Sequence, residues 1–153
     1  MKRALNLAYA MQKWLWRLFR PRTRGVKVML FNPAGEILLI RNSYGRSDLF
    51  VLPGGGARPW ETIEKAARRE VREELGCSVD RLDQVSTHFS SAEGKRDTIH
   101  LFAALTKDDF TPDYVEVDEA RYFALDALPE NISAATLRRI EEHQGKRKRN
   151  GQW

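Results

Sequence analysis

Residues 52–77 of this 153-residue chain read LPGGGARPWETIEKAARREVREELGC and contain its most specific pattern. Three glycines follow a short apolar segment, and a helix is predicted over Thr62–Leu75, with Thr62 as its N-cap and Gly76 as the C′ residue that ends it. Glu70, Glu73 and Glu74 are three and four residues apart, which places their carboxylates on one face of that helix. Like charges at this spacing repel by roughly 0.2–0.5 kcal/mol per pair, so the face by itself indicates a solvated helix surface.

The glycine run before the helix changes that interpretation. Gly54, Gly55 and Gly56 allow backbone carbonyls and amides to approach a ligand closely. Carboxylate and carbonyl oxygens together suit Mg²⁺ or Mn²⁺. These ions clamp phosphates, neutralise charge at phosphorus and activate water. The sequence therefore predicts a divalent-cation site for a phosphate-bearing substrate between the glycines and the helix.

The same stretch resembles the Nudix box. In that motif a glycine, five residues and a glutamate are followed, after seven more residues, by Arg-Glu-aliphatic-any-Glu-Glu-any-Gly-aliphatic. The matching positions are Gly55, Glu61 and Arg69-Glu70-Val71-Arg72-Glu73-Glu74-Leu75-Gly76-Cys77. Only Cys77 departs, since an aliphatic residue is usual there. The resemblance implies an α/β fold, the Nudix-like α/β/α sandwich with a mixed sheet, here preceded by an N-terminal amphipathic helix.

The resemblance also implies a role for each matching residue. Glu70, Glu73 and Glu74 match the metal-binding glutamates, and the carbonyl of Gly54 or Gly55 often completes the coordination. Glu61 matches a glutamate that usually pairs with the motif arginine, here Arg69. The expected catalytic residues are Glu70, Glu73, Arg69 and Glu61; the expected substrate-binding residues are Arg58, Gly55 and Gly56; and the expected metal ligands are Glu70, Glu73, Glu74 and Gly54.

Two positions depart from many family members, and the general base stays open. Arg58 stands where a glutamate sometimes binds additional metal, so we expect fewer bound ions and a possible contact to a substrate phosphate. Trp60 replaces a glycine and is expected to pack locally. The base candidates are Glu70 and Glu73 inside the motif, and Glu93, Glu116 and Glu119 outside it.

Three segments are expected along the chain: an amphipathic basic helix and linker over 1–24, the hydrolase domain over 25–144, and a basic tail over 145–153 predicted to be disordered. The helix covers 4–19 and the linker 20–25. Strands are predicted at 26–32, 36–41, 49–52, 82–89, 98–106 and 120–123, and a second helix at 133–143. His88 and His100 fall in strands and are interpreted as structural.

Charge is distributed unevenly along the chain. Residues 1–27 carry eight Lys or Arg and no acid, whereas residues 28–137 carry twelve Lys or Arg against nineteen Asp or Glu. The basic first helix, with its stripe of Leu7, Met11, Trp14, Leu15 and Leu18, is expected to pack on the domain or to form a homodimer; contact of residues 1–20 with a membrane surface is an alternative. The single cysteine and the absence of a signal peptide or membrane span predict a cytoplasmic protein.

The function expected from the resemblance is metal-dependent hydrolysis of a diphosphate linkage in a nucleoside diphosphate derivative, with Mg²⁺ or Mn²⁺ as cofactor and a nucleotide as partner. One alternative is an RNA 5′-end pyrophosphohydrolase, which the basic ends favour. Another is a non-catalytic Nudix-fold nucleotide-binding module, whose mark would be loss of the motif glutamates. All of these glutamates are present here.

Overall fold

The computed structural model describes residues 2–19, 22–92 and 96–153. Its elements are, in chain order, α1 (Lys2–Phe19), β1 (Arg22–Phe31), β2 (Ile37–Asn42), α2 (Ile63–Leu75), β3 (Arg81–Ser90), β4 (Arg96–Leu105), β5 (Val117–Phe123) and α3 (Ala134–His143). They confirm the predicted α/β class with a mixed sheet and a helix at the N-terminal end.

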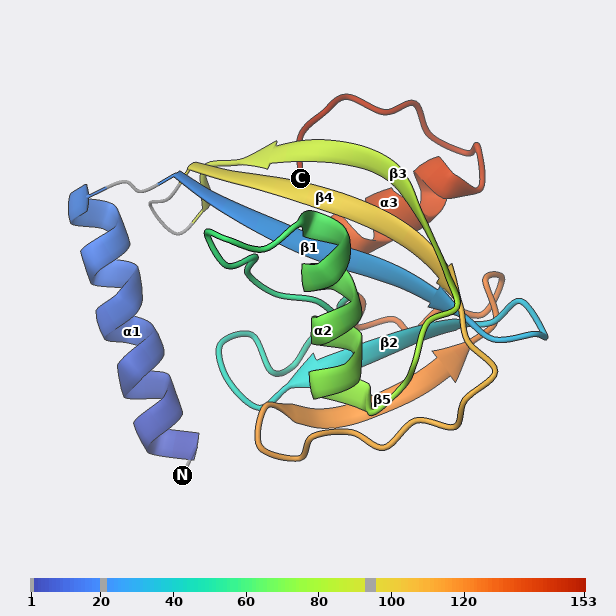
Figure 1. Cartoon of the computed structure of the whole chain (residues 1–153), viewed down its shortest axis with the longest axis horizontal. Helices are drawn as coiled ribbons and strands as arrows, with labels where there is room; N and C mark the ends of the chain where they lie inside the picture. Colours follow the sequence, from blue (N-terminus) through green and yellow to red (C-terminus); the bar gives the residue numbers. More distant parts are fainter. Residues whose placement is uncertain (1, 20–21, 93–95) are drawn as a thin grey trace.

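The five strands form one sheet in the order β3-β4-β1-β2-β5. β1 pairs with β4 in parallel, and the other three pairings are antiparallel. Figure 1 shows α2 lying across one face of this sheet and α3 against the opposite face, with α1 standing beside the domain. The arrangement of the domain is the expected α/β/α sandwich.

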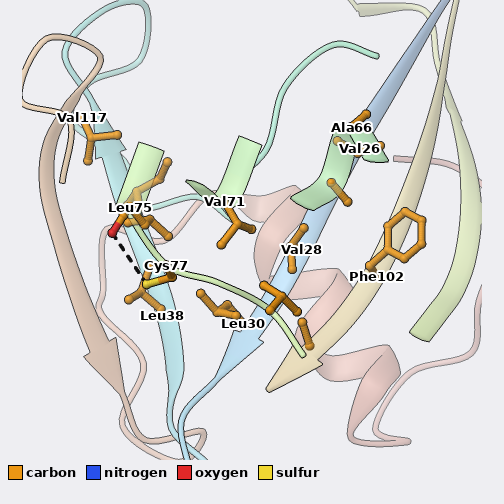
Figure 2. Close-up of a cluster of buried hydrophobic side chains, with 14 residues drawn as sticks. Val26, Val28, Leu30, Leu38, Ala66, Val71, Leu75, Cys77, Phe102 and Val117 are labelled. Atoms are coloured by element: carbon orange, nitrogen blue, oxygen red, sulfur yellow. Dashed lines mark hydrogen bonds between the residues drawn. The ribbon is translucent and has the colours of Figure 1, made fainter. Parts of the chain in front are cut away.

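Alternation along the central strands builds a core on each face of the sheet. Val26, Val28 and Leu30 of β1 are fully buried on the α2 side, in one cluster with Ala66 and Val71 (Figure 2). The alternate side of the sheet carries a second cluster, which includes Met29 of β1, Leu39 of β2 and Ile140 of α3. Because successive side chains of a strand point to opposite faces, one strand supplies both cores.

Two predictions are wrong: the start of the first strand and the existence of a strand at 49–52. Residues 22–25 belong to β1 rather than to a linker, because their backbone pairs with β4 from Arg22 opposite Arg96 to Gly25 opposite Ile99. This places the start of the domain at Arg22 instead of residue 25. The strand predicted at 49–52 is reduced to isolated bridges from Val51 to Ile40 and from Phe50 to Ile132.

The basic tail is ordered, which corrects the prediction of disorder and of a separate segment. Residues Gly151–Trp153 return along the edge strand β3, where the amide of Phe89 donates to Gly151 O and the amide of Trp153 donates to Phe89 O. The Trp153 ring packs against the second core cluster and edge-on against His88. An exposed sheet edge gains from such pairing, because its backbone groups otherwise lack partners in the sheet.

Helix α1 begins earlier than predicted and is mostly exposed. Among its described side chains, Leu7, Met11 and Trp14 are 74%, 62% and 63% exposed. The side chain of Leu18, which the sequence analysis places in the apolar stripe, lies outside the described residues. Within the described part of the chain, no helix combines the length and apolarity required to cross a bilayer.

We expect Trp153→Ala to lower the free energy of unfolding by about 1–3 kcal/mol, less than the ~3–5 kcal/mol of a fully buried tryptophan because the ring is only partly covered. Urea unfolding followed by circular dichroism measures the change. Lys148→Ala, at an exposed tail position, is the control and should change stability by less than about 0.5 kcal/mol. Equal stability of the two variants would contradict the packing of the tail.

We expect His88 to make the fold sensitive to acid. Its ring is 1% exposed, with Nδ1 at 2.7 Å from the Arg139 guanidinium and Nε2 at 2.7 Å from Ser86 Oγ. Since a guanidinium only donates, Nδ1 accepts and the neutral ring donates through Nε2. Burial, followed by the charge of Arg139, lowers the pKa of His88 to about 4.

Because that pKa lies below the unfolded value of about 6.5, the contribution of His88 is complete above pH ~6.5 and is lost as the pH falls toward 4. We expect His88→Gln to lose less unfolding free energy than the parent chain between pH 7 and pH 4.5. Urea titrations at the two pH values measure the difference. Parallel losses in both proteins would show that His88 does not carry this dependence.

Candidate active site

Local capping signals fix the ends of α2 and hence the angle at which its glutamates emerge. The Thr62 side chain accepts from the amide of Lys65, and Gly76 ends the helix in the left-handed conformation at φ 67°. Both caps were predicted from the sequence and are confirmed. The buried face of α2, which includes Ala67, Val71 and Leu75, rests on the sheet. Glu70 and Glu74 therefore face the glycine bend beside the first half of β1.

The glycine bend, residues 53–56, runs beside β1 like a short extra strand. The amide of Val26 donates to Gly55 O at 2.9 Å, and the amide of Val28 donates to Pro53 O at 3.0 Å. Gly54 has φ 129°, and a Cβ at this position would overlap the carbonyl oxygen of Val26. Glycine is required there both by the backbone angle and by the close approach to β1.

Two of the motif glutamates contact this bend directly. The carboxylate of Glu70 lies only 2.8 Å from the point where a Cβ of Gly55 would be. Glu74 is 6% exposed, and its Oε2 accepts from the amide of Gly54 at 2.8 Å. The structure thus brings Glu70, Glu74, Gly54 and Gly55 together.

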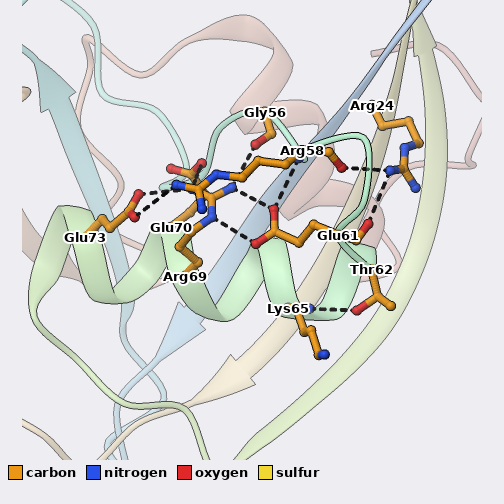
Figure 3. A network of polar contacts seen from close by, with 9 residues as sticks. All are labelled: Arg24, Gly56, Arg58, Glu61, Thr62, Lys65, Arg69, Glu70 and Glu73. Atoms are coloured by element: carbon orange, nitrogen blue, oxygen red, sulfur yellow. Dashed lines mark hydrogen bonds and ion pairs between the residues drawn. The ribbon is translucent and has the colours of Figure 1, made fainter.

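Arg69 binds the remaining carboxylates into one network (Figure 3). Its guanidinium contacts Glu61 Oε1 at 2.9 Å, Glu70 Oε1 at 2.7 Å and Glu73 Oε2 at 3.0 Å, and it also donates to Gly56 O at 2.9 Å. The predicted pairing of Glu61 with Arg69 is confirmed. Hydrogen bonds from Arg69 lower the pKa of Glu61 to about 2, so this carboxylate stays charged.

Lys27 belongs to the site and was not predicted. Its ammonium donates to Leu52 O and Gly54 O, each at 2.9 Å, and its charge opposes the burial that raises the pKa of Glu70 and Glu74. A signal existed in the sequence, because a single lysine interrupts the apolar run of β1 and a charge in a core strand needs a partner. Arg24 was also missed; it donates to the carbonyls of Arg58, Pro59 and Glu61.

The positive charges near Glu70 and Glu74 do not offset the effect of burial on these two carboxylates. Burial, reinforced by the neighbouring charges of Glu70 and Glu116, raises the pKa of Glu74 to about 7 in spite of Lys27 and the Gly54 amide. Burial also raises the pKa of Glu70 against the opposing effect of Arg69. A cation beside these carboxylates would restore their charged forms.

This donor set fits the expected divalent cation. Carboxylate oxygens of Glu70 and Glu74 lie beside backbone carbonyls of the bend, and a carbonyl that already accepts one hydrogen bond keeps a second lone pair. Within the described residues, no three His, Cys, Asp or Glu side chains form a ready cluster for a metal ion. Glu73 contacts Arg69 and lies on the more exposed side, at 53% side-chain exposure.

The other predicted residues lie around this centre. Arg58 is exposed, with its guanidinium 3.9 Å from Glu73, and Trp60 is 82% exposed, so the expected local packing of Trp60 is wrong. Of the possible bases outside the motif, Glu119 forms an ion pair with Arg41 at 2.7 Å. Glu116 lines the cavity beside the bend, and Glu93 lies outside the described residues.

The cavity in front of the bend has a volume of about 1270 Å³. One wall contains Gly54, Gly55, Gly56 and the start of β1, and the opposite wall contains residues of α1, among them Tyr9 and Leu15. It is large enough for a nucleotide-sized ligand. The wall formed by the glycine bend is polar and borders the carboxylates of α2. The wall formed by α1 is mainly apolar.

A glycine bend packed against a glutamate-bearing helix on a mixed sheet defines the class of protein. The sequence profile of the NUDIX domain matches residues 21–144. The chain belongs to the Nudix family.

The names of the relatives that match this chain give different substrates. The NAD-capped RNA hydrolase NudC of Deinococcus radiodurans is 35% identical over 100 residues, which cover 64% of this chain and 35% of that protein. The oxidized purine nucleoside triphosphate hydrolase of Danio rerio is 36% identical over 80 residues, which cover 50% of this chain and 49% of that protein. The matched region thus spans half or less of the length of these relatives.

Solved structures match the domain more completely. The MutT NUDIX hydrolase from Burkholderia pseudomallei superposes with a TM-score of 0.70 at 26% identity, over 78% of this chain and 96% of that one. The MutT protein from Methanosarcina mazei superposes with a TM-score of 0.69 at 24% identity, over 84% of this chain and 98% of that one. The second comparison supports the fold alone.

The three glycines should respond differently to alanine. A Cβ at Gly55 would displace the Glu70 carboxylate, a flexible side-chain end, so we expect Gly55→Ala to keep its stability and to lose Mn²⁺ affinity by about tenfold or more. Gly54→Ala should unfold readily, because its Cβ meets backbone. Isothermal titration with Mn²⁺ and urea unfolding measure the two effects.

Gly56→Ala is the matched control for these variants. No atom lies within 4 Å of a Cβ at this position, and we expect parental stability and metal affinity. If Gly55→Ala bound Mn²⁺ as tightly as Gly56→Ala, Glu70 and the bend would not form one site.

Proposed function

We propose that this chain is a metal-dependent hydrolase that cleaves the diphosphate linkage of a nucleoside diphosphate derivative, giving a nucleoside monophosphate and a phosphorylated second product. The observation that carries the proposal is the placement of Glu70 and Glu74 directly against the bend at Gly54 and Gly55. Membership in the Nudix family supports the same reaction class.

Each residue of the network has a defined task in this proposal. Glu70 and Glu74, with Glu73 at the open side and the carbonyl of Gly54, would hold Mg²⁺ or Mn²⁺. When bound, such an ion neutralises phosphate charge and lowers the pKa of a coordinated water. Arg69, itself paired with Glu61, fixes the orientation of Glu70 and Glu73 through bonds of 2.7–3.0 Å. Gly55, Gly56 and Arg58 would bind phosphate oxygens at the mouth of the cavity.

A second candidate function is hydrolysis at the 5′ end of RNA. Several relatives are named NAD-capped RNA hydrolases, and both ends of this chain are rich in Lys and Arg. Parallel assays with a free dinucleotide and with the same dinucleotide at the end of an RNA separate the two. Much faster turnover of the RNA, lost at high salt, would favour the second candidate.

We expect Glu70→Gln to lower kcat/KM by about a hundredfold or more, because an amide keeps the shape of the side chain and removes its charge. Glu74→Gln should act in the same direction. Release of nucleoside monophosphate across a Mn²⁺ titration measures the loss. Glu64→Gln, at an exposed position in the first turn of α2, should behave as the parent protein. Parental turnover in both Glu70→Gln and Glu74→Gln would remove the proposed metal role.

A further inference from the structure

Helix α1 presents an apolar stripe that the domain leaves uncovered. Leu7, Met11 and Trp14 are spaced by four and three residues, so they lie on one side of the helix. They are 74%, 62% and 63% exposed. Single exposed apolar residues are ordinary, but a contiguous stripe on one helix indicates a surface that another apolar phase covers.

Two contacts of α1 with the domain lie away from this stripe on the helix. The ring of Tyr9 packs against Tyr44 at 5.5 Å between centroids, and Asn6 Oδ1 accepts from the amide of Gly45 at 3.4 Å. Tyr9 follows Leu7 by two residues, about 200° around the helix. Leu7 and Trp14 are absent from the lining of the cavity between α1 and the domain, whereas Met11, at 62% exposure, lies at the edge of that cavity.

The charge of this segment indicates what covers the stripe. Residues 1–24 contain seven Lys or Arg and no Asp or Glu. A second copy of α1 would bring the same positive charge against itself, and a nucleic acid would need the charge but not the apolar stripe. An anionic bilayer satisfies both, because its headgroups attract Lys and Arg while its interface accepts Leu, Met and Trp side chains.

We propose that α1 lies flat on an anionic lipid bilayer with Leu7, Met11 and Trp14 inserted at the interface. The cavity of the candidate active site has α1 as one wall, so docking places the cavity mouth close to the membrane surface. This proposal is independent of the reaction that the site performs.

Flotation of the full-length protein with vesicles tests the proposal. We expect it to rise with vesicles of phosphatidylcholine and phosphatidylglycerol, to bind less at high salt, and to stay behind with phosphatidylcholine alone. Trp14→Glu should lower partitioning by about tenfold or more. Leu7→Glu should act likewise. Tyr114→Glu is the matched control, since Tyr114 is a 71% exposed aromatic outside α1 and the charge change is identical.

Thermal unfolding and turnover of a soluble nucleotide without vesicles separate this proposal from the proposed function, because both should be parental in Trp14→Glu and Leu7→Glu. Loss of flotation in these two variants with retention in Tyr114→Glu supports the proposal. It is overturned if the parent protein does not float, or if Trp14→Glu floats equally. It is also overturned if sedimentation reveals a dimer that Trp14→Glu dissociates while no variant binds vesicles.

Discussion

The bend at Gly54 and Gly55 is held between a strand backbone on one side and two helix carboxylates on the other. On the strand side, the bend bonds to Val26, and no Cβ fits at Gly54. On the helix side, Glu74 accepts from the Gly54 amide and Glu70 fills the space that a Cβ of Gly55 would take. The distance between β1 and α2 at this point is therefore set by the absence of side chains, and any larger residue would separate the carboxylates from the backbone oxygens.

This spacing has an electrostatic cost that the rest of the site offsets only in part. Removing carboxylates from water disfavours their charged forms, and the raised pKa values of Glu70 and Glu74 reflect that effect. Lys27 of strand β1 and Arg69 of helix α2 both bring positive charge to these carboxylates. Both side chains also have backbone partners, since Lys27 donates to Leu52 O and Arg69 donates to Gly56 O.

Sequence reasoning succeeded where the determining interactions are local. The caps of α2 depend on residues within one turn of the helix, and both Thr62 and Gly76 were identified correctly. It failed where stability comes from distant partners. β1 starts at Arg22 because β4, more than seventy residues later, pairs with its polar beginning. The tail is ordered because Phe89 offers an unpaired strand edge, and neither pairing leaves a mark in the residues that form it.

Two buried charged clusters occur in the described structure, and their charge balance distinguishes their roles. On the α3 side, Arg139 is fully buried, pairs with Glu142 at 2.8 Å and meets a neutral His88. That cluster is close to neutral, and the Trp153 ring lies against both Arg139 and His88.

On the α2 side, Glu61, Glu70, Glu73 and Glu74 share Arg69 and Lys27 as buried-side cations, and the exposed Arg58 lies 3.9 Å from Glu73. The inner part of this cluster keeps an excess of negative charge and borders a cavity that is open to solvent. A neutral, closed cluster stabilises the fold without a ligand. An anionic cluster beside an open cavity is stabilised by a cation that enters from solution, which is the condition that a site for an anionic diphosphate requires.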